Sequence, residues 1–173
     1  MDEAGPRGMS EIFASLVSQG VPFLVLPRPA ANGVDAAARA NGLNPSELVR
    51  TEVLVGARGP ALVVVPWGRR VDLPAAREAL AEPTARRASP AELRAIAPMC
   101  DPDAVPPLAS QLRAPLYVDV AVAARDQLVF AAGRSNVLVC VGRAELFASH
   151  PYVVAPLATS AALGGRSARE PVS

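Results

Sequence analysis

The side chains that most often serve as nucleophiles, bases or metal ligands are scarce in this sequence. It has two cysteines, Cys100 and Cys140, one histidine, His150, and no lysine. The lack of lysine excludes Schiff-base and amine-base chemistry, because an arginine keeps its proton in a protein. The cysteines have no CxxC partner and are expected to be free thiols, with Cys140 buried in a strand. One histidine and two scattered cysteines make no ligand set, so we expect no metal and no cofactor.

Arginines are the remaining candidates for binding chemistry. The net charge of +1 provides no general attraction for nucleic acid, so any contact with RNA must be made locally, by a few arginines around one site. The candidates are Arg50, Arg58, the pair Arg69 and Arg70, and the pair Arg86 and Arg87. Paired arginines on a surface are more often solvated than bound to a ligand, so each pair taken alone favours solvated charge.

The length and composition are typical of one folded globular domain. The chain has 173 residues, of which 51% are hydrophobic and 19% charged. No apolar run approaches the roughly 18 residues that a membrane span needs. Asp2 and Glu3 stand where a signal peptide would have a basic start, so we expect a cytoplasmic protein. The small and polar residues near the end predict a domain over 1–157 and a flexible tail over 158–173.

Short apolar runs separated by Gly and Pro predict a mixture of strands and short helices. Hydrophobic spacing and cap residues predict helices over 10–19, 34–40, 74–81, 90–97 and 143–149, with a short capped helix after Asn44. Strands are predicted over 21–26, 51–57, 61–65, 115–120, 127–132 and 136–141. The fold class that follows is α/β of the α+β type, with a mixed, largely antiparallel sheet of about six strands surrounded by short helices.

Three local features receive structural interpretations. Val63, Val64 and Val65 are apolar in succession, which indicates a strand buried on both faces of its sheet. Asp119 stands where it would cap a helix that follows its strand. Trp67 is interpreted as a turn aromatic without a ligand role.

Three segments together resemble the YbaK family, which includes free-standing aminoacyl-tRNA deacylases and the editing domain inserted in bacterial prolyl-tRNA synthetases. The first is 37–51, AARANGLNPSELVRT, which is similar to a small helix, a Leu-Gly-type turn and a helix leading to a Lys-Thr pair. The second is 61–73, ALVVVPWGRRVDL, similar to a buried strand, a Gly/Arg turn and Asp-Leu. The third is the series SPAEL at 89–93, VPPL at 105–108, LYVD at 116–119 and AGR at 132–134. The resemblance covers about residues 10 to 150 and implies a YbaK-like, barrel-like sheet.

The chemistry implied by this resemblance is hydrolysis of the ester between a wrong amino acid and the terminal ribose of tRNA. The family uses no side-chain nucleophile: a Gly-x-x-x-Pro loop holds the aminoacyl group through its backbone, a lysine lies against the phosphate or the substrate, and a water attacks. Arg50 stands at the lysine position, and Asp103 and Pro107 stand at the ends of the loop pattern. The substrate-binding residues implied by the same positions are Thr51, Ala104, Val105, Pro106, Leu108, Ala109, Gly133, Arg134 and Ser135.

Three functions follow from these observations as hypotheses. The first is a trans-editing aminoacyl-tRNA deacylase, whose partners are the tRNA acceptor end and, as a further partner, an aminoacyl-tRNA synthetase. The second is a YbaK-like binding module that keeps the fold without catalysis and holds a tRNA 3′ end, an aminoacyl analogue or a protein partner. Arg50 at the lysine position and Asp103 at the glycine position motivate it. The third is an unrelated thiol enzyme that pairs Cys100 or Cys140 with His150.

Overall fold

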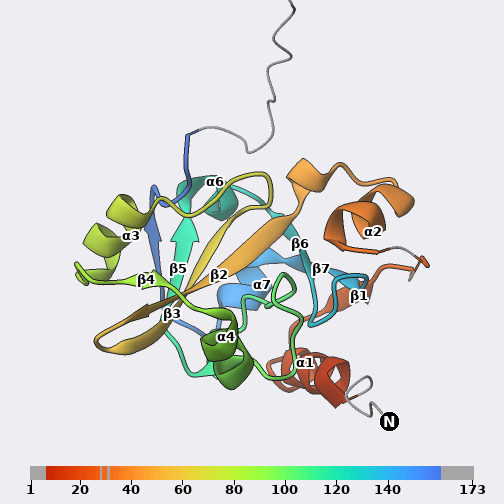
Figure 1. Ribbon diagram of the computed structural model, residues 1–173. Helices are drawn as coiled ribbons and strands as arrows, with labels where there is room; N and C mark the ends of the chain where they lie inside the picture. Colours follow the sequence, from red (N-terminus) through yellow and green to blue (C-terminus); the bar gives the residue numbers. More distant parts are fainter. Residues whose placement is uncertain (1–6, 28, 31, 161–173) are drawn as a thin grey trace, which may run out of the picture.

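Two sheets organise the computed structural model, which describes residues 7–27, 29–30 and 32–160. Within these residues the smaller sheet has the strand order β1-β7-β6 and the larger one β4-β2-β3-β5-β8. The strands are β1 (Phe23–Val25), β2 (Val49–Gly56), β3 (Gly59–Pro66), β4 (Arg86–Arg87), β5 (Leu116–Asp119), β6 (Gln127–Ala131), β7 (Leu138–Gly142) and β8 (Tyr152–Ala155). The β2–β3 hairpin runs through the middle of the molecule, as Figure 1 shows.

Short helices surround the sheets. They are α1 (Arg7–Ser18), α2 (Val34–Ala40), the 3-10 helix η1 (Pro45–Glu47), α3 (Leu73–Leu80), α4 (Pro90–Ile96), α5 (Ala109–Leu112), α6 (Val120–Ala123) and α7 (Arg143–Phe147). Asn44 and Ser89 both form the complete capping box that their spacing predicts. In the part of the chain that the structure describes, no helix is both long and apolar enough to cross a membrane.

The sheet pairing is mixed. β2 and β3 pair antiparallel from Val49↔Pro66 to Gly56↔Gly59, whereas β3, β5 and β8 pair parallel, and the smaller sheet is antiparallel throughout. In the described part of the chain an isolated parallel bridge, Leu48↔Val129, links the residue before β2 to β6 of the smaller sheet. The predicted fold class is confirmed, although the strands form two open sheets and do not close into a barrel.

Two cores hold the larger sheet in place. One lies between the sheets and is covered by α1, with Phe130, Ile12 and Leu16 among its fully buried side chains. The other lies on the opposite face under α3 and contains Val63 and Val65. All three valines at 63–65 are 0% exposed, which confirms the prediction of a strand buried on both faces.

Asp119 caps α6, as predicted, and also holds the end of the described chain. Its Oδ1 accepts a hydrogen bond from the Ala121 amide, while its Oδ2 accepts from the amides of Leu157 and Ala158 at 2.8 and 2.9 Å. Thr159 adds a bond from its amide to the Arg70 carbonyl. The tail predicted over 158–173 therefore begins with two residues bonded to the domain, and its residues 161–173 lie outside the described part.

One burial prediction is wrong. Cys140 lies in β7 as expected, but it is only half-buried. Alternation along β7 turns Val139 and Val141 into the core, so Cys140 faces the other side, between Leu24 and Val129 on the neighbouring strands. The strand prediction was correct, but a continuous apolar run does not reveal which side of the sheet is covered.

Candidate functional site

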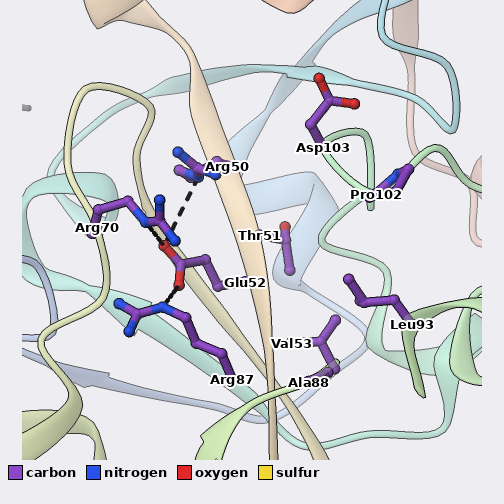
Figure 2. Close-up of a pocket in the computed structure, with 10 residues that line it drawn as sticks. All are labelled: Arg50, Thr51, Glu52, Val53, Arg70, Arg87, Ala88, Leu93, Pro102 and Asp103. Carbon is purple, nitrogen blue, oxygen red and sulfur yellow. Dashed lines mark hydrogen bonds and ion pairs between the residues drawn. The ribbon is translucent and has the colours of Figure 1, made fainter. Parts of the chain in front are cut away.

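A cavity of about 150 Å³ opens beside β2, where the loop over 101–104 approaches the strand. Its wall includes an arginine group, Arg50, Arg70 and Arg87, arranged around Glu52 (Figure 2). The remaining lining residues are Thr51, Val53, Ala88, Leu93, Pro102 and Asp103. The cavity thus has cationic, apolar and acidic parts within a small volume.

Arg50 lies in this wall and does not extend into bulk water. Its guanidinium packs over the Trp67 ring, 4.9 Å from the centroid, and its side chain is 23% exposed. Trp67 is fixed in turn by a hydrogen bond from its indole Nε1 to Asp35, so this turn aromatic positions a site residue. Burial, only partly offset by Glu52, lowers the pKa of Arg50, but an arginine remains protonated at neutral pH.

The carboxylate of Glu52 pairs with all three arginines. The Nε atoms of Arg70 and Arg87 donate hydrogen bonds to its two oxygens at 3.2 and 2.8 Å, and Nε of Arg50 is 3.9 Å away. Glu52 is 8% exposed and also accepts a bond from the Val71 amide. Three positive charges around one negative charge leave a local excess of two, which is suited to binding an anion such as a phosphodiester.

The edge of β2 is open at Thr51. The Trp67 amide donates a hydrogen bond to the Leu48 carbonyl, so the backbone groups of Leu48 point towards β3. Backbone groups alternate in direction along an antiparallel strand, so those of Arg50 and Glu52 also point towards β3. Those of Thr51 point the other way, to the outer edge of β2. On that outer edge β4 pairs only with Leu54 and Val55, and the Ala88 amide adds one bond to the Val53 carbonyl. The chain then turns at Ser89 into α4, whose first residue is a proline without an amide hydrogen. The Thr51 amide and carbonyl are therefore directed to the cavity side.

The loop opposite β2 is braced by the turn over 133–135. Asp101 accepts hydrogen bonds from the Ser135 amide at 3.0 Å and from Arg134 at 3.2 Å. The Ser135 hydroxyl lies 2.5 Å from Oδ1 of Asp103. Gly133 adopts φ 82°, and a Cβ there would lie 2.7 Å from the Ile12 side chain, so this position requires glycine. The predicted residues Gly133, Arg134 and Ser135 thus hold the loop against the cavity.

The other predicted site residues lie deeper. The structure brings Arg50, Thr51 and Asp103 to the same cavity, as the resemblance implies. The segment over 104–109 is buried behind the loop and does not line the cavity directly; it contains Ala104, Val105, Pro106, Pro107, Leu108 and Ala109. Contact of these residues with a substrate remains a prediction.

The sequence identified only part of the arginine group's setting. Arg70 and Arg87 were among the candidates for contact with RNA, although each pair taken alone favoured solvated charge, and Glu52 was not singled out. The available signal was the alternation on β2, which places Arg50 and Glu52 on the same face two residues apart. The partners Arg70 and Arg87 come from a turn and a two-residue strand, which carry no periodicity of their own.

Neither cysteine has the surroundings of a nucleophile. Burial, with a smaller effect from Asp101, raises the pKa of the Cys100 thiol to about 12, and burial also raises that of Cys140. Within the described residues no hydrogen bond joins either thiol to His150. The same part of the chain contains no group of three His, Cys, Asp or Glu side chains that could hold a metal ion.

We expect Cys100 to resist alkylation in the folded protein. At pH 8 a thiol with a pKa near 12 is only about one part in ten thousand thiolate, the reactive form. Iodoacetamide should therefore modify Cys140 first and reach Cys100 only after unfolding, as followed by mass spectrometry of digested peptides. Rapid modification of Cys100 in the native protein would instead indicate an activated thiol and restore the thiol-enzyme hypothesis.

Comparisons with known proteins agree with this geometry. A family model for the aminoacyl-tRNA editing domain matches residues 28–148. The solved structure of a candidate trans-editing enzyme for prolyl-tRNA synthetase is 25% identical, with a TM-score of 0.75 over 92% of this chain and 99% of that one. A hypothetical protein is 24% identical, with a TM-score of 0.76 over 86% of this chain and 99% of that one. A search of the curated proteins gives no match.

Proposed function

This chain belongs to the aminoacyl-tRNA editing domain family, and from that premise we propose that it is a trans-editing deacylase. The proposed reaction is hydrolysis of the ester that joins a small, wrongly attached amino acid to the terminal ribose of tRNA. The observation that carries the proposal is the cavity beside β2, where the arginine group, an open strand edge and a small apolar wall meet. The predicted resemblance to the YbaK family is confirmed by the family match and the fold.

The arginine group is the part of the cavity suited to the tRNA end. Glu52 fixes the orientation of Arg70 and Arg87, and Arg50 is held by Trp67, so these cations are arranged before a ligand arrives. A phosphodiester near the ester accepts charge-assisted hydrogen bonds from such planar groups. Because the net charge of the chain is only +1, this local contact supplies the attraction for RNA.

The apolar part of the cavity is suited to a small side chain. A volume of about 150 Å³ is well below the roughly 300–1,000 Å³ of sites for drug-sized ligands. Val53, Ala88 and Leu93 supply the apolar surface. A site of this size admits alanine, serine or cysteine esters and excludes large side chains by steric conflict.

The ester is attacked by water in this proposal. The water oxygen bonds to the ester carbonyl carbon and gives up a proton to solvent, and the carbonyl oxygen becomes an oxyanion. The bond from that carbon to the ribose oxygen then breaks, and the ribose oxygen takes up a proton, so that the amino acid and tRNA with a free terminal hydroxyl are released. The Thr51 amide, directed to the cavity by the strand register, is suitably placed to donate a hydrogen bond to that oxyanion. Among the described lining residues there is no cysteine or histidine, in keeping with attack by water.

Deacylation of a panel of mischarged tRNAs tests the proposal. tRNAPro charged with alanine, serine or cysteine is incubated with micromolar protein, and the release of labelled amino acid is measured against spontaneous hydrolysis. We expect faster release of at least one of the three small amino acids and no effect on a large one such as phenylalanine. If all esters stay intact while the protein binds the tRNA, the chain is a binding module, and the deacylase proposal fails.

A further inference from the structure

Asp103 is a carboxylate at the cavity wall whose charge is not neutralised by a neighbour. Its side chain is exposed, and only Oδ1 has a hydrogen-bond partner, the Ser135 hydroxyl. No arginine among the described residues lies within ion-pair distance of it. The nearby Asp101 is different, because Arg134 lies 3.2 Å from its Oδ1 and Ser135 occupies its Oδ2. Asp103 is thus held in place while one of its oxygens remains available.

The charges of the cavity are separated across its opening. Arg50 lies on β2, Arg70 on the neighbouring turn and Arg87 on β4, whereas Asp103 lies on the opposite loop (Figure 2). Thr51 lines the cavity next to Arg50. The two sides are close enough that Asp103 acts electrostatically on Arg50. Asp103 therefore gives this small site one negative end, which is exposed to a ligand.

An aminoacyl ester of tRNA has the complementary charges. Its phosphodiester is an anion, and the α-amino group of the attached amino acid is an ammonium when protonated. These two groups flank the ester carbonyl, where the reaction takes place. A phosphodiester on the arginine group and the ester at Thr51 bring the α-ammonium to the side of the cavity where Asp103 lies.

We propose that Asp103 binds the α-ammonium group and selects esters whose amino group is free, an inference that rests on the proposed deacylase function. An N-acylated amino acid has no positive charge at this position and adds bulk, so it loses the charge-assisted contact to Asp103. The substrate class is therefore the free aminoacyl ester, as distinct from N-acylaminoacyl or peptidyl esters.

The decisive variant is Asp103→Asn, because it removes the charge and keeps the size and the acceptor for Ser135. Binding is measured by calorimetry with an amide-linked mimic that is not hydrolysed, 3′-(alanylamino)-3′-deoxyadenosine 5′-phosphate, and with its N-acetyl form. We expect the parent to bind the free amine form about 10- to 100-fold more tightly, as for a charge-assisted hydrogen bond. In Asp103→Asn this preference should fall to within about threefold, through weaker binding of the free amine form alone.

A second variant separates charge recognition from bracing of the loop. Asp101→Asn weakens the contact to Arg134 while the Asp103 carboxylate remains, so it should affect both mimics equally. If the parent binds both forms with equal affinity, or if Asp103→Asn keeps the preference, the inference is wrong. This experiment measures binding and needs no hydrolysis. A protein that fails the deacylation panel can therefore still show, or fail to show, recognition of the free amine, and the two failures are distinguished.

Discussion

Replacing Arg50 with alanine is expected to lower kcat/KM for deacylation by about 10- to 100-fold, since a hydrogen bond to a charged group contributes about 1.5–3 kcal/mol. The guanidinium is held over Trp67 at the cavity wall. The Nε atom of Arg50 is buried without a hydrogen-bond partner among the described residues, and the 3.9 Å to Glu52 is too long for one. The terminal guanidinium nitrogens of Arg50 form no hydrogen bond to another described residue, so they are the donors left for an anionic ligand.

Two further variants show whether the effect is local. Arg50→Lys keeps the charge but loses the planar fork and the stacking on Trp67, so its kcat/KM should lie between those of the parent and the alanine variant. Arg58→Ala removes another arginine that is paired with a carboxylate, Glu82, but it lies at the far end of the hairpin and should leave deacylation unchanged. Full activity of Arg50→Ala, with an unchanged melting temperature, would show that the substrate is bound elsewhere.

The placement of Arg50 near the start of β2 could be predicted because it depends only on residues adjacent in sequence. A capped turn at Asn44 leads directly into β2, so the order of residues fixes where the arginine emerges. The same holds for the hairpin, whose register is set by the short turn between the strands. The role of Asp119 as a helix cap could likewise be predicted, because it depends on only three or four consecutive residues.

The environment of Arg50 could not be predicted, because it is made by residues distant in sequence. Arg87 reaches Glu52 only because β4 pairs with β2 at Leu54 and Val55, and a two-residue strand has no pattern to recognise. Arg70 is directed to the same carboxylate by the turn before α3. The sequence therefore identified these arginines as candidates but could not give their arrangement, since a pair of arginines in a chain does not show which carboxylate they meet.

The missed strand β8 has a similar cause. It pairs parallel with β5, from Leu116↔Tyr152 to Asp119↔Ala155, so its partner is more than thirty residues away. Val153 and Val154 are about half exposed on this edge strand, so no alternation of buried and exposed positions marks it. Parallel pairing at the edge is decided by tertiary contacts, which the local pattern does not contain.

Glu52→Gln is expected to have the second large effect, on stability as well as on activity. The substitution leaves three guanidiniums around a neutral amide that is 8% exposed in the parent. Removing one partner from a buried ion pair costs about 3–5 kcal/mol, and the partial exposure of Arg70 and Arg87 reduces this to about 2–3 kcal/mol. For a chain of this length that corresponds to a melting temperature lower by about 5–10 °C. Deacylation should also fall at least tenfold, because the arginines lose their common anchor.

If the stability lost in Glu52→Gln comes from repulsion within the arginine group, a bound anion should restore it. Inorganic phosphate at about ten times its Kd should raise the free energy of unfolding of Glu52→Gln by roughly 1.4 kcal/mol, which corresponds to several degrees in melting temperature. The parent should gain much less, because its Glu52 carboxylate competes with phosphate for the same arginines. Glu82→Gln is the matched control, because Glu82 is equally buried and binds Arg58 and two backbone amides away from the cavity. That variant should also melt earlier, yet gain nothing from phosphate and keep its deacylation rate. Equal phosphate effects on the two variants would mean that Glu52 only stabilises the fold, and that the arginines around it do not form an anion site.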